Sequence, residues 1–239
     1  MNFLKSVFMA VIVTTLTLGF GTCAMLLSPF DRSGNLVHWF ARWWARTLLW
    51  TGRIPVRIDG LANVPFDRPC ILASNHASAA DIPILFGHLP FQFRVIAKDS
   101  LFRIPVLGWC MRLAGYIGID RGSPTKAMRS LRRAAGRLQS GLPVLVFPEG
   151  TRSRTGELLP FHNGAFLLAI EAGVPVVPIG IRGSYEILVS GSMGIRPGID
   201  VSICVGPAIE TANYSRKERG ELALKVQEAV RRCLDSDVP

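Results

Sequence analysis

A histidine and an aspartate five residues apart are the first candidates for catalysis. His76 follows the apolar run 70–74, and Asp81 comes five residues later. A histidine at the end of a strand can act as a general base, and a carboxylate beside it fixes its tautomer and stabilises the imidazolium that forms. Five residues of regular helix would leave the two side chains about 140° apart, so the pair forms only if His76 precedes the helix. Pro83 fits a first helical turn and favours that arrangement. The alternative is that Asp81 only caps a helix and that His76 is an ordinary loop histidine.

Charged residues also follow two other apolar runs, 116–119 and 144–147. After the first run come Asp120 and Arg121, and after the second come Glu149, Gly150, Thr151 and Arg152. Arginine pairs bidentately with phosphate, whereas a carboxylate repels it. We therefore expect Arg121 and Arg152 to bind an anion, and Glu149 to orient an arginine or to accept a hydrogen bond from a substrate hydroxyl. The alternative is that both segments are no more than turns after strands.

The segment 174–179 is apolar and contains Pro175 and Pro178. Because proline lacks the N–H that an inner strand donates, this pattern predicts an edge strand or the wall of an apolar pocket.

These residues need a framework that brings the ends of several strands together. Short apolar runs alternate with helical patterns: the expected strands are 56–59, 70–74, 94–97, 116–119, 144–147, 176–181 and 200–205, and the expected helices are 81–86, 106–113, 124–139, 164–172 and 216–234. Such alternation predicts an α/β domain, here residues 54–239, with a mixed, largely parallel sheet flanked by helices. Ligands in such sheets bind beyond the carboxyl ends of the strands.

Residues 1–53 have the pattern of a hydrophobic and amphipathic helical membrane anchor. Residues 6–27 carry no charge, and as a helix they would extend roughly 33 Å, enough for a hydrocarbon core of about 30 Å. The alternative is a cleaved signal peptide, but no clear small-residue cleavage site follows.

The following segment, 36–50, holds four of the five tryptophans. A polar stripe recurs at helical spacing through His38, Arg42, Arg46 and Arg53. Tryptophan with arginine on one helix is typical of a lipid–water interface, so we expect these guanidinium groups to meet lipid phosphates. The alternative is a core helix of a soluble domain.

Charge and composition restrict the partners. The 27 lysines and arginines exceed the 17 acidic residues, which gives a net charge of +10. Two segments account for the excess. Residues 31–58 contain five arginines and one aspartate, and residues 94–154 contain twelve lysines and arginines and three acidic residues. An anionic partner is therefore expected, and it is not nucleic acid, because the aromatic residues are not interleaved with the second basic block.

The same composition excludes several classes of protein. The 49% hydrophobic content excludes a disordered chain, and the odd number and wide spacing of the five cysteines favour reduced thiols without a metal site. A serine hydrolase is disfavoured because Ser190 stands where the first glycine of Gly-x-Ser-x-Gly should be.

The four motifs, in their order and spacing, resemble the glycerophospholipid acyltransferase family. The matching blocks are His-x4-Asp at 76–81, Ile-Asp-Arg at 119–121, Phe-Pro-Glu-Gly-Thr-Arg-Ser at 147–153 and Val-Pro-x-x-Pro at 174–178. The resemblance is close over residues 70–181 and looser over the amino terminus. Gly118 departs from it where many relatives carry a bulkier residue, and His162 departs from it where a more basic residue is common.

The resemblance implies a reaction and a set of site residues. His76 would deprotonate the free sn-2 hydroxyl of 1-acyl-glycerol-3-phosphate, which attacks the thioester of acyl-CoA or acyl-carrier protein to give phosphatidic acid, and Asp81 would hold His76. It also implies binding residues, namely Arg121, Glu149, Gly150, Thr151 and Arg152 for the glycerol phosphate, and Val174, Pro175 and Pro178 for the acyl donor. No metal or cofactor is implied. Another lysolipid acceptor, such as a lysophospholipid or lyso-ornithine lipid, or a non-catalytic lipid-binding role, remains an alternative. The implied location is a membrane among phospholipids, with the site on the cytoplasmic side of a bacterial inner membrane.

Overall fold

A mixed sheet forms the centre of the protein. The computed structural model describes residues 3–120, 124–188 and 195–236, and over these residues the sheet has seven strands in the order β1-β7-β6-β2-β5-β3-β4. The strands are β1 (Val56–Asp59), β2 (Ile71–Ser74), β3 (Arg94–Lys98), β4 (Ile117–Ile119), β5 (Val144–Val146), β6 (Val176–Arg182) and β7 (Val201–Val205). The five strands from β6 to β4 are mutually parallel, whereas β7 is antiparallel to β6 and carries β1 parallel to itself. The predicted mixed, largely parallel α/β sheet is confirmed.

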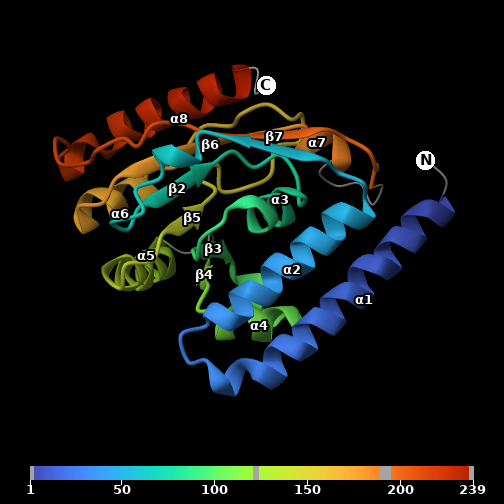
Figure 1. Ribbon diagram of the computed structural model, residues 1–239. Helices are drawn as coiled ribbons and strands as arrows, with labels where there is room; N and C mark the ends of the chain where they lie inside the picture. Colours follow the sequence, from blue (N-terminus) through green and yellow to red (C-terminus); the bar gives the residue numbers. More distant parts are fainter. Residues whose placement is uncertain (1–2, 121–123, 189–194, 237–239) are drawn as a thin grey trace.

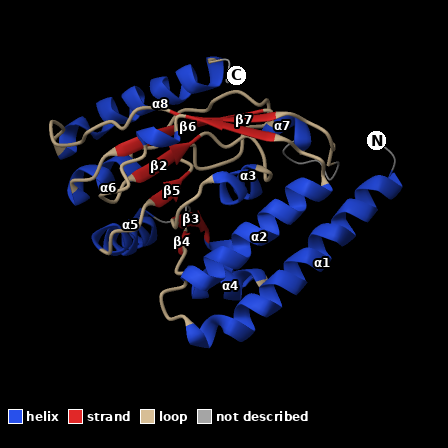
Figure 2. Ribbon diagram, viewed as in Figure 1, coloured by secondary structure: helices blue, strands red, loops and turns tan. Residues whose placement is uncertain are grey.

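Helices cover both faces of this sheet (Figures 1 and 2). On one face α2 (Asn35–Thr51) and α3 (Asp81–His88) pack on side chains such as Leu72 and Leu145. On the other face α5 (Pro124–Gln139), α6 (Gly164–Ala172) and α8 (Arg219–Asp235) pack on the alternating side chains, such as Ile71 and Val144. Both faces are apolar because parallel strands are buried on each side.

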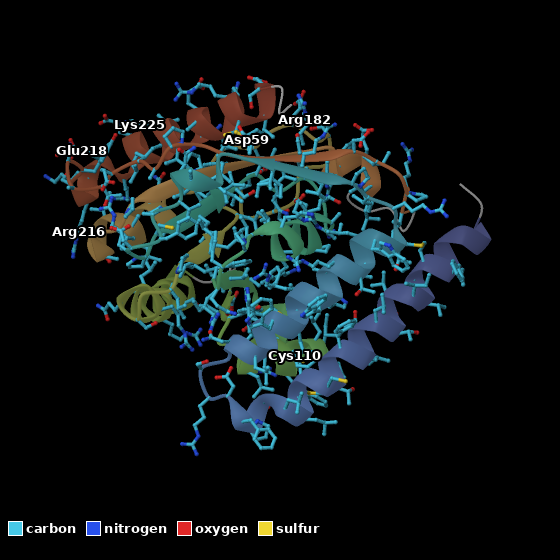
Figure 3. The ribbon with its side chains drawn as sticks, viewed as in Figure 1. Asp59, Cys110, Arg182, Arg216, Glu218 and Lys225 are labelled. Atoms are coloured by element: carbon cyan, nitrogen blue, oxygen red, sulfur yellow. The ribbon has the colours of Figure 1, made fainter. Side chains whose placement is uncertain are left out.

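The shorter elements connect these layers. They are α4 (Leu107–Leu113), α7 (Ser184–Ile187) and the 3-10 turns η1 (Ser28–Phe30), η2 (Leu61–Asn63), η3 (Asp99–Arg103) and η4 (Arg216–Glu218). The predicted helix 216–234 therefore divides into η4 and α8. The reason is a capping box, in which the backbone N–H of Ser215 donates to Glu218 Oε2 at 2.7 Å and the Ser215 hydroxyl accepts from the Glu218 N–H. Figure 3 shows Arg216 and Glu218 at this end of α8.

Strand β6 differs from its prediction, because it is an inner strand between β7 and β2. Pro178 is tolerated there at an interruption of the β6–β7 pairing. Val176 exchanges both backbone hydrogen bonds with Ile209, and regular pairing resumes at Ile179 with Val205. By strand alternation the nitrogen of Pro178 points to the same side as that of Val176, toward the irregular chain around Gly206, which needs no donor from it.

Helix α1 (Phe3–Leu27) is long and apolar enough to cross a membrane by length and composition. Its candidate span, Val7–Phe30, has a mean hydropathy of 2.0, and only 6% of its most apolar window is buried. α1 lies alongside α2 (Figure 1), where Trp44 Nε1 donates to Thr17 Oγ1 at 3.1 Å. Helix α1 is thus held by a hydrogen bond to α2, the helix that packs on the sheet.

Helix α2 is amphipathic as expected, but two residues of its polar stripe face the protein. His38 and Arg42 are buried against the body, and Arg46 donates to the backbone carbonyl of Gly87 at 3.0 Å. Burial, with Arg94 and Arg42 nearby, lowers the pKa of His38 to about 3, so the ring is neutral and shares a hydrogen bond with the Tyr116 hydroxyl. The expectation of contact with lipid phosphates is wrong for Arg42, because its side chain is buried against the body. Arg46 and Arg53 are exposed, so for these two residues the expectation stays a prediction. Trp39, Trp43 and Trp50 are exposed on the same helix.

Ala45 and Leu49 of α2 belong to the same core cluster as β2 and β5. The expected boundary between an anchor ending at 53 and a body beginning at 54 therefore runs through a packed interface.

Candidate active site

Asp81 and His76 meet in the loop that follows β2. Asp81 is fully buried at the start of α3, and its Oδ2 accepts hydrogen bonds from three donors: His76 Nδ1 at 2.8 Å and the backbone N–H groups of Ala77 and Ser78, both at 2.9 Å. His76 lies in the loop before the helix, so the geometric condition set by the five-residue spacing is met. Oδ1 of Asp81 is buried without a hydrogen-bond partner among the described residues.

This geometry fixes the tautomer of His76. Because Nδ1 donates its proton to the carboxylate, Nε2 carries the lone pair. The imidazole stacks on the ring of Phe147 with centroids 4.1 Å apart, and 15% of the His76 side chain remains exposed. An oriented, partly accessible Nε2 is what a general base requires.

Glu149 holds the main chain of His76 rather than an arginine. Its Oε1 accepts the backbone N–H of His76 at 2.6 Å, and its Oε2 accepts the backbone N–H of Leu159 at 3.2 Å. The backbone N–H of Ser153 donates to the carbonyl of His76 at 2.8 Å. Burial raises the pKa of Glu149 to about 7. The loop after β5 therefore forms hydrogen bonds with both the backbone N–H and the backbone carbonyl of His76.

Two positioning residues of this loop have no role in the sequence prediction. The amide of Asn75 is buried and accepts from the backbone N–H of Ile181 at 2.8 Å while donating to the carbonyl of Ile181 at 3.0 Å. Ser78 donates its hydroxyl to the carbonyl of Leu188 at 2.8 Å. A signal for Asn75 was available, because asparagine at a strand end can replace a peptide group in pairing.

Arg152 and Thr151 are exposed beside this loop, and no hydrogen bond or ion pair within the described residues engages the Arg152 guanidinium. Gly150 has φ +70°, and a Cβ there would lie 2.9 Å from Cδ2 of His162, so this turn requires glycine. Arg121 lies outside the described residues. The structure thus brings Glu149, Gly150, Thr151 and Arg152 next to His76 and Asp81.

The expected acyl-donor residues are not all brought to this site. Val174 and Pro175 precede β6, at the amino edge of the parallel strands, where their carbonyls accept from Thr211 Oγ1 and from the backbone N–H of Ile71. Ile179 pairs with Ser74, so Val174 lies five residues, roughly 17 Å, back along the sheet from the level of Ser74. Pro178 pairs with Ala73 inside the sheet. The apolar character of 174–178 belongs to the core: Val174 is part of the buried cluster beneath α6 and α8.

Among the described residues, no three His, Cys, Asp or Glu side chains lie close enough together to hold a metal ion. The five cysteines are free thiols.

A histidine oriented by a buried carboxylate lies beside an arginine that has no partner among the described residues, an arrangement that suits proton abstraction from a substrate with an anionic group. The family model described as Acyltransferase matches residues 55–182. The chain belongs to this acyltransferase family.

Relatives with known names support that assignment. A chloroplastic 1-acyl-sn-glycerol-3-phosphate acyltransferase of Brassica napus is 39% identical over 74% of the chain, which spans about half (51%) of that protein. The 1-acyl-sn-glycerol-3-phosphate acyltransferase of Saccharomyces cerevisiae is 33% identical over 87% of the chain and 70% of its own length. The crystal structure of the 1-acyl-sn-glycerophosphate (LPA) acyltransferase PlsC from Thermotoga maritima superposes with a TM-score of 0.83 at 29% identity, covering 97% of the chain and 93% of that protein.

Proposed function

We propose that the protein transfers a fatty acyl group to the sn-2 hydroxyl of 1-acyl-glycerol-3-phosphate, giving phosphatidic acid. The observation that carries this proposal is the 2.8 Å hydrogen bond from His76 Nδ1 to Asp81, which leaves Nε2 as a base. The names of the relatives supply the acceptor, and the acyl donor is a thioester of coenzyme A or of acyl-carrier protein.

The reaction proceeds by direct transfer, without a metal, a cofactor or an acyl-enzyme. Nε2 of His76 takes the proton of the acceptor hydroxyl as its oxygen bonds to the thioester carbonyl carbon. The C–S bond then breaks, and the leaving thiolate takes the proton back from Nε2. Asp81 stabilises the imidazolium between these steps. The engagement of the Ser78 hydroxyl with Leu188 supports direct transfer, because this serine is not aligned with His76 as a nucleophile.

Arg152 binds the phosphate of the acceptor, together with Arg121. Its guanidinium is exposed and has no partner among the described residues, and Glu149 in the same loop is turned inward onto backbone N–H groups. The positive charge is therefore not neutralised within the loop, as an anion site requires.

The site works at a membrane, where both lipids reside. α1 and the tryptophan face of α2 form the lipid-facing surface. The hydrogen bond between α1 and α2 and the packing of α2 on the core favour a hairpin that lies in one leaflet rather than across the bilayer. The expected location is the cytoplasmic side of a bacterial inner membrane.

An acyl-transfer assay with purified full-length protein tests this function. 1-Acyl-glycerol-3-phosphate and other lysolipids are offered with acyl-CoA or acyl-carrier-protein donors. The expected result is phosphatidic acid formation that His76→Ala abolishes while the circular dichroism and melting temperature stay unchanged. A His76→Ala protein that turns over at a near-normal rate would contradict the assignment.

A further inference from the structure

A pocket of about 590 Å³ lies along the outer edge of β4, the last strand of the sheet. η3 and α4 line one side of it and the last turns of α5 line the other. Arg112, Arg133 and Arg137 project from these helices, whereas Asp99 is the one acidic residue of the described lining. Two net positive charges therefore surround a space of ligand size whose lining contains none of the residues assigned to the proposed reaction.

Local contacts keep this pocket open and pre-formed. Arg133 donates to the carbonyl of Gly118 at 3.3 Å and to Ser130 Oγ at 3.1 Å. A Cβ at Gly118 would lie 3.0 Å from Asp99 Oδ1 and 3.3 Å from the ring of Phe102, so a larger residue would fill this space. A Cβ at Gly115 would lie 2.8 Å from the Arg137 guanidinium. The two glycines thus give the arginines room beside the strand.

The surface next to the pocket is apolar and continues α1. α4 touches α1 at Gly21, where a Cβ would meet Val106 at 2.5 Å and where Cys110 Sγ contacts the Gly21 carbonyl at 3.4 Å. Figure 3 shows Cys110 on α4 between the sheet and α1.

The faces of α4 follow in a definite order. At 100° per residue, Leu113, Trp109 and Arg112 lie about 60°, 100° and 160° from Cys110 in one direction. Trp109 and Leu113 are 52% and 43% exposed, and Met111 on the opposite side is buried. Around the exposed face of α4, the apolar side chains Leu113 and Trp109 therefore lie between the contact with α1 and Arg112 at the pocket.

We propose that the pocket binds the phosphate headgroup of an anionic membrane phospholipid that is not the acyl acceptor. An arginine cluster pairs with phosphate, and a tryptophan beside it fits headgroup depth in a bilayer. The lipid tails lie along Trp109, Leu113 and α1, so the bound lipid fixes the β4 edge of the body against the leaflet. The lining of this site shares no residue with those assigned to the proposed reaction.

Native mass spectrometry of the full-length protein in neutral detergent tests the site. Phosphatidylglycerol is titrated against phosphatidylcholine with identical acyl chains, and phosphatidylglycerol has no free sn-2 hydroxyl, so it is not an acceptor. We expect tighter retention of phosphatidylglycerol. The double variant Arg112→Gln/Arg137→Gln should weaken it on the order of tenfold, the effect of losing a charged hydrogen bond, with phosphatidylcholine retention unchanged.

The matched control is Arg57→Gln/Arg231→Gln, which removes two exposed arginines from β1 and α8, away from β4. It should retain phosphatidylglycerol like the unmodified protein.

Arg112→Gln alone, at an exposed position, tests the site if the double variant unfolds. Equal retention of both lipids by the unmodified protein, or an unchanged preference in the Arg112 variants, would overturn the proposal. A third arm offers inorganic phosphate and coenzyme A: their arginine-dependent binding without any lipid preference would assign the pocket to soluble anions and overturn it as well.

Discussion

The carboxylate of Glu149 accepts the backbone N–H of His76 at 2.6 Å, from the loop of a neighbouring strand. The same carboxylate accepts the backbone N–H of Leu159 through its other oxygen. Each of its oxygens therefore accepts a main-chain N–H, which makes the glutamate of the 147–153 block a positioning residue for the histidine loop. Its predicted role in binding the substrate stays a prediction.

Replacing Glu149 with glutamine should lower kcat about tenfold with little change in KM for the acceptor. One amide oxygen can serve only one of the two N–H donors, and the amide NH2 would face the other, which costs on the order of one hydrogen bond. Steady-state kinetics over both substrates measure the separation of the two constants. A raised KM with unchanged kcat would instead place Glu149 on the acceptor.

Glu149 also makes stability depend on pH. Burial raises its pKa from 4.5 to about 7 in the folded protein. The unfolded chain loses this proton near pH 4.5 and the folded chain near 7, so the stabilisation is complete below pH 4.5 and falls as the pH rises to 7, by up to about 3 kcal/mol. Melting temperatures in detergent between pH 4.5 and 7 should show this fall in the unmodified protein and a flatter profile in Glu149→Gln. Parallel profiles would exclude Glu149 as its source.

The pairing of His76 with Asp81 was predicted from sequence on one condition, that His76 precede the helix, and Pro83 favoured that condition without excluding an ordinary helix cap. The role of Glu149 was not, since a hydrogen bond to the backbone of His76 depends on how two loops fold against each other. The same limit applies to α2. Its helical period is evident, but only tertiary packing shows that His38 and Arg42 face the core. The apolar segment at Val174 was predicted to be an edge strand or a pocket wall, and the register of β6 with β2 places it in the core instead.

Replacing Asp81 with asparagine should keep the loop but slow the chemistry. Three donors converge on Oδ2, and Oδ1 has no partner in the described structure. An asparagine oxygen can take the place of Oδ2, which preserves the tautomer of His76 and removes the charge, while its NH2 takes the place of the buried Oδ1 and costs some stability for lack of an acceptor. Without that charge the imidazolium loses about 3 kcal/mol of stabilisation, so kcat should fall on the order of 100-fold. Circular dichroism verifies the fold, and a variant with normal kcat would show that the carboxylate charge is dispensable.

Replacing Arg152 with glutamine should raise KM for 1-acyl-glycerol-3-phosphate about tenfold while kcat changes little, because binding to a remote phosphate is equally strong before and during the reaction. A lysolipid without a phosphomonoester should show no such increase. Arg57→Gln, on β1 at the far edge of the sheet, is the charge-matched control. An equal rise in KM for both variants would attribute the effect to net charge rather than to the site.

Replacing Asn75 with alanine should destabilise the fold and slow turnover together. The buried amide satisfies both the N–H and the carbonyl of Ile181, and alanine would leave these two groups without partners at the end of β6. Two unsatisfied backbone groups cost about 2 kcal/mol or more, which corresponds to a fall of roughly 4–8 °C in melting temperature for a chain of this size. Asn213→Ala, at an exposed position, should leave the melting temperature unchanged. Because Asn75 joins His76 directly to β6, kcat of the folded Asn75 variant should also fall. A protein with lowered stability but full kcat would show that the histidine loop keeps its place without this link.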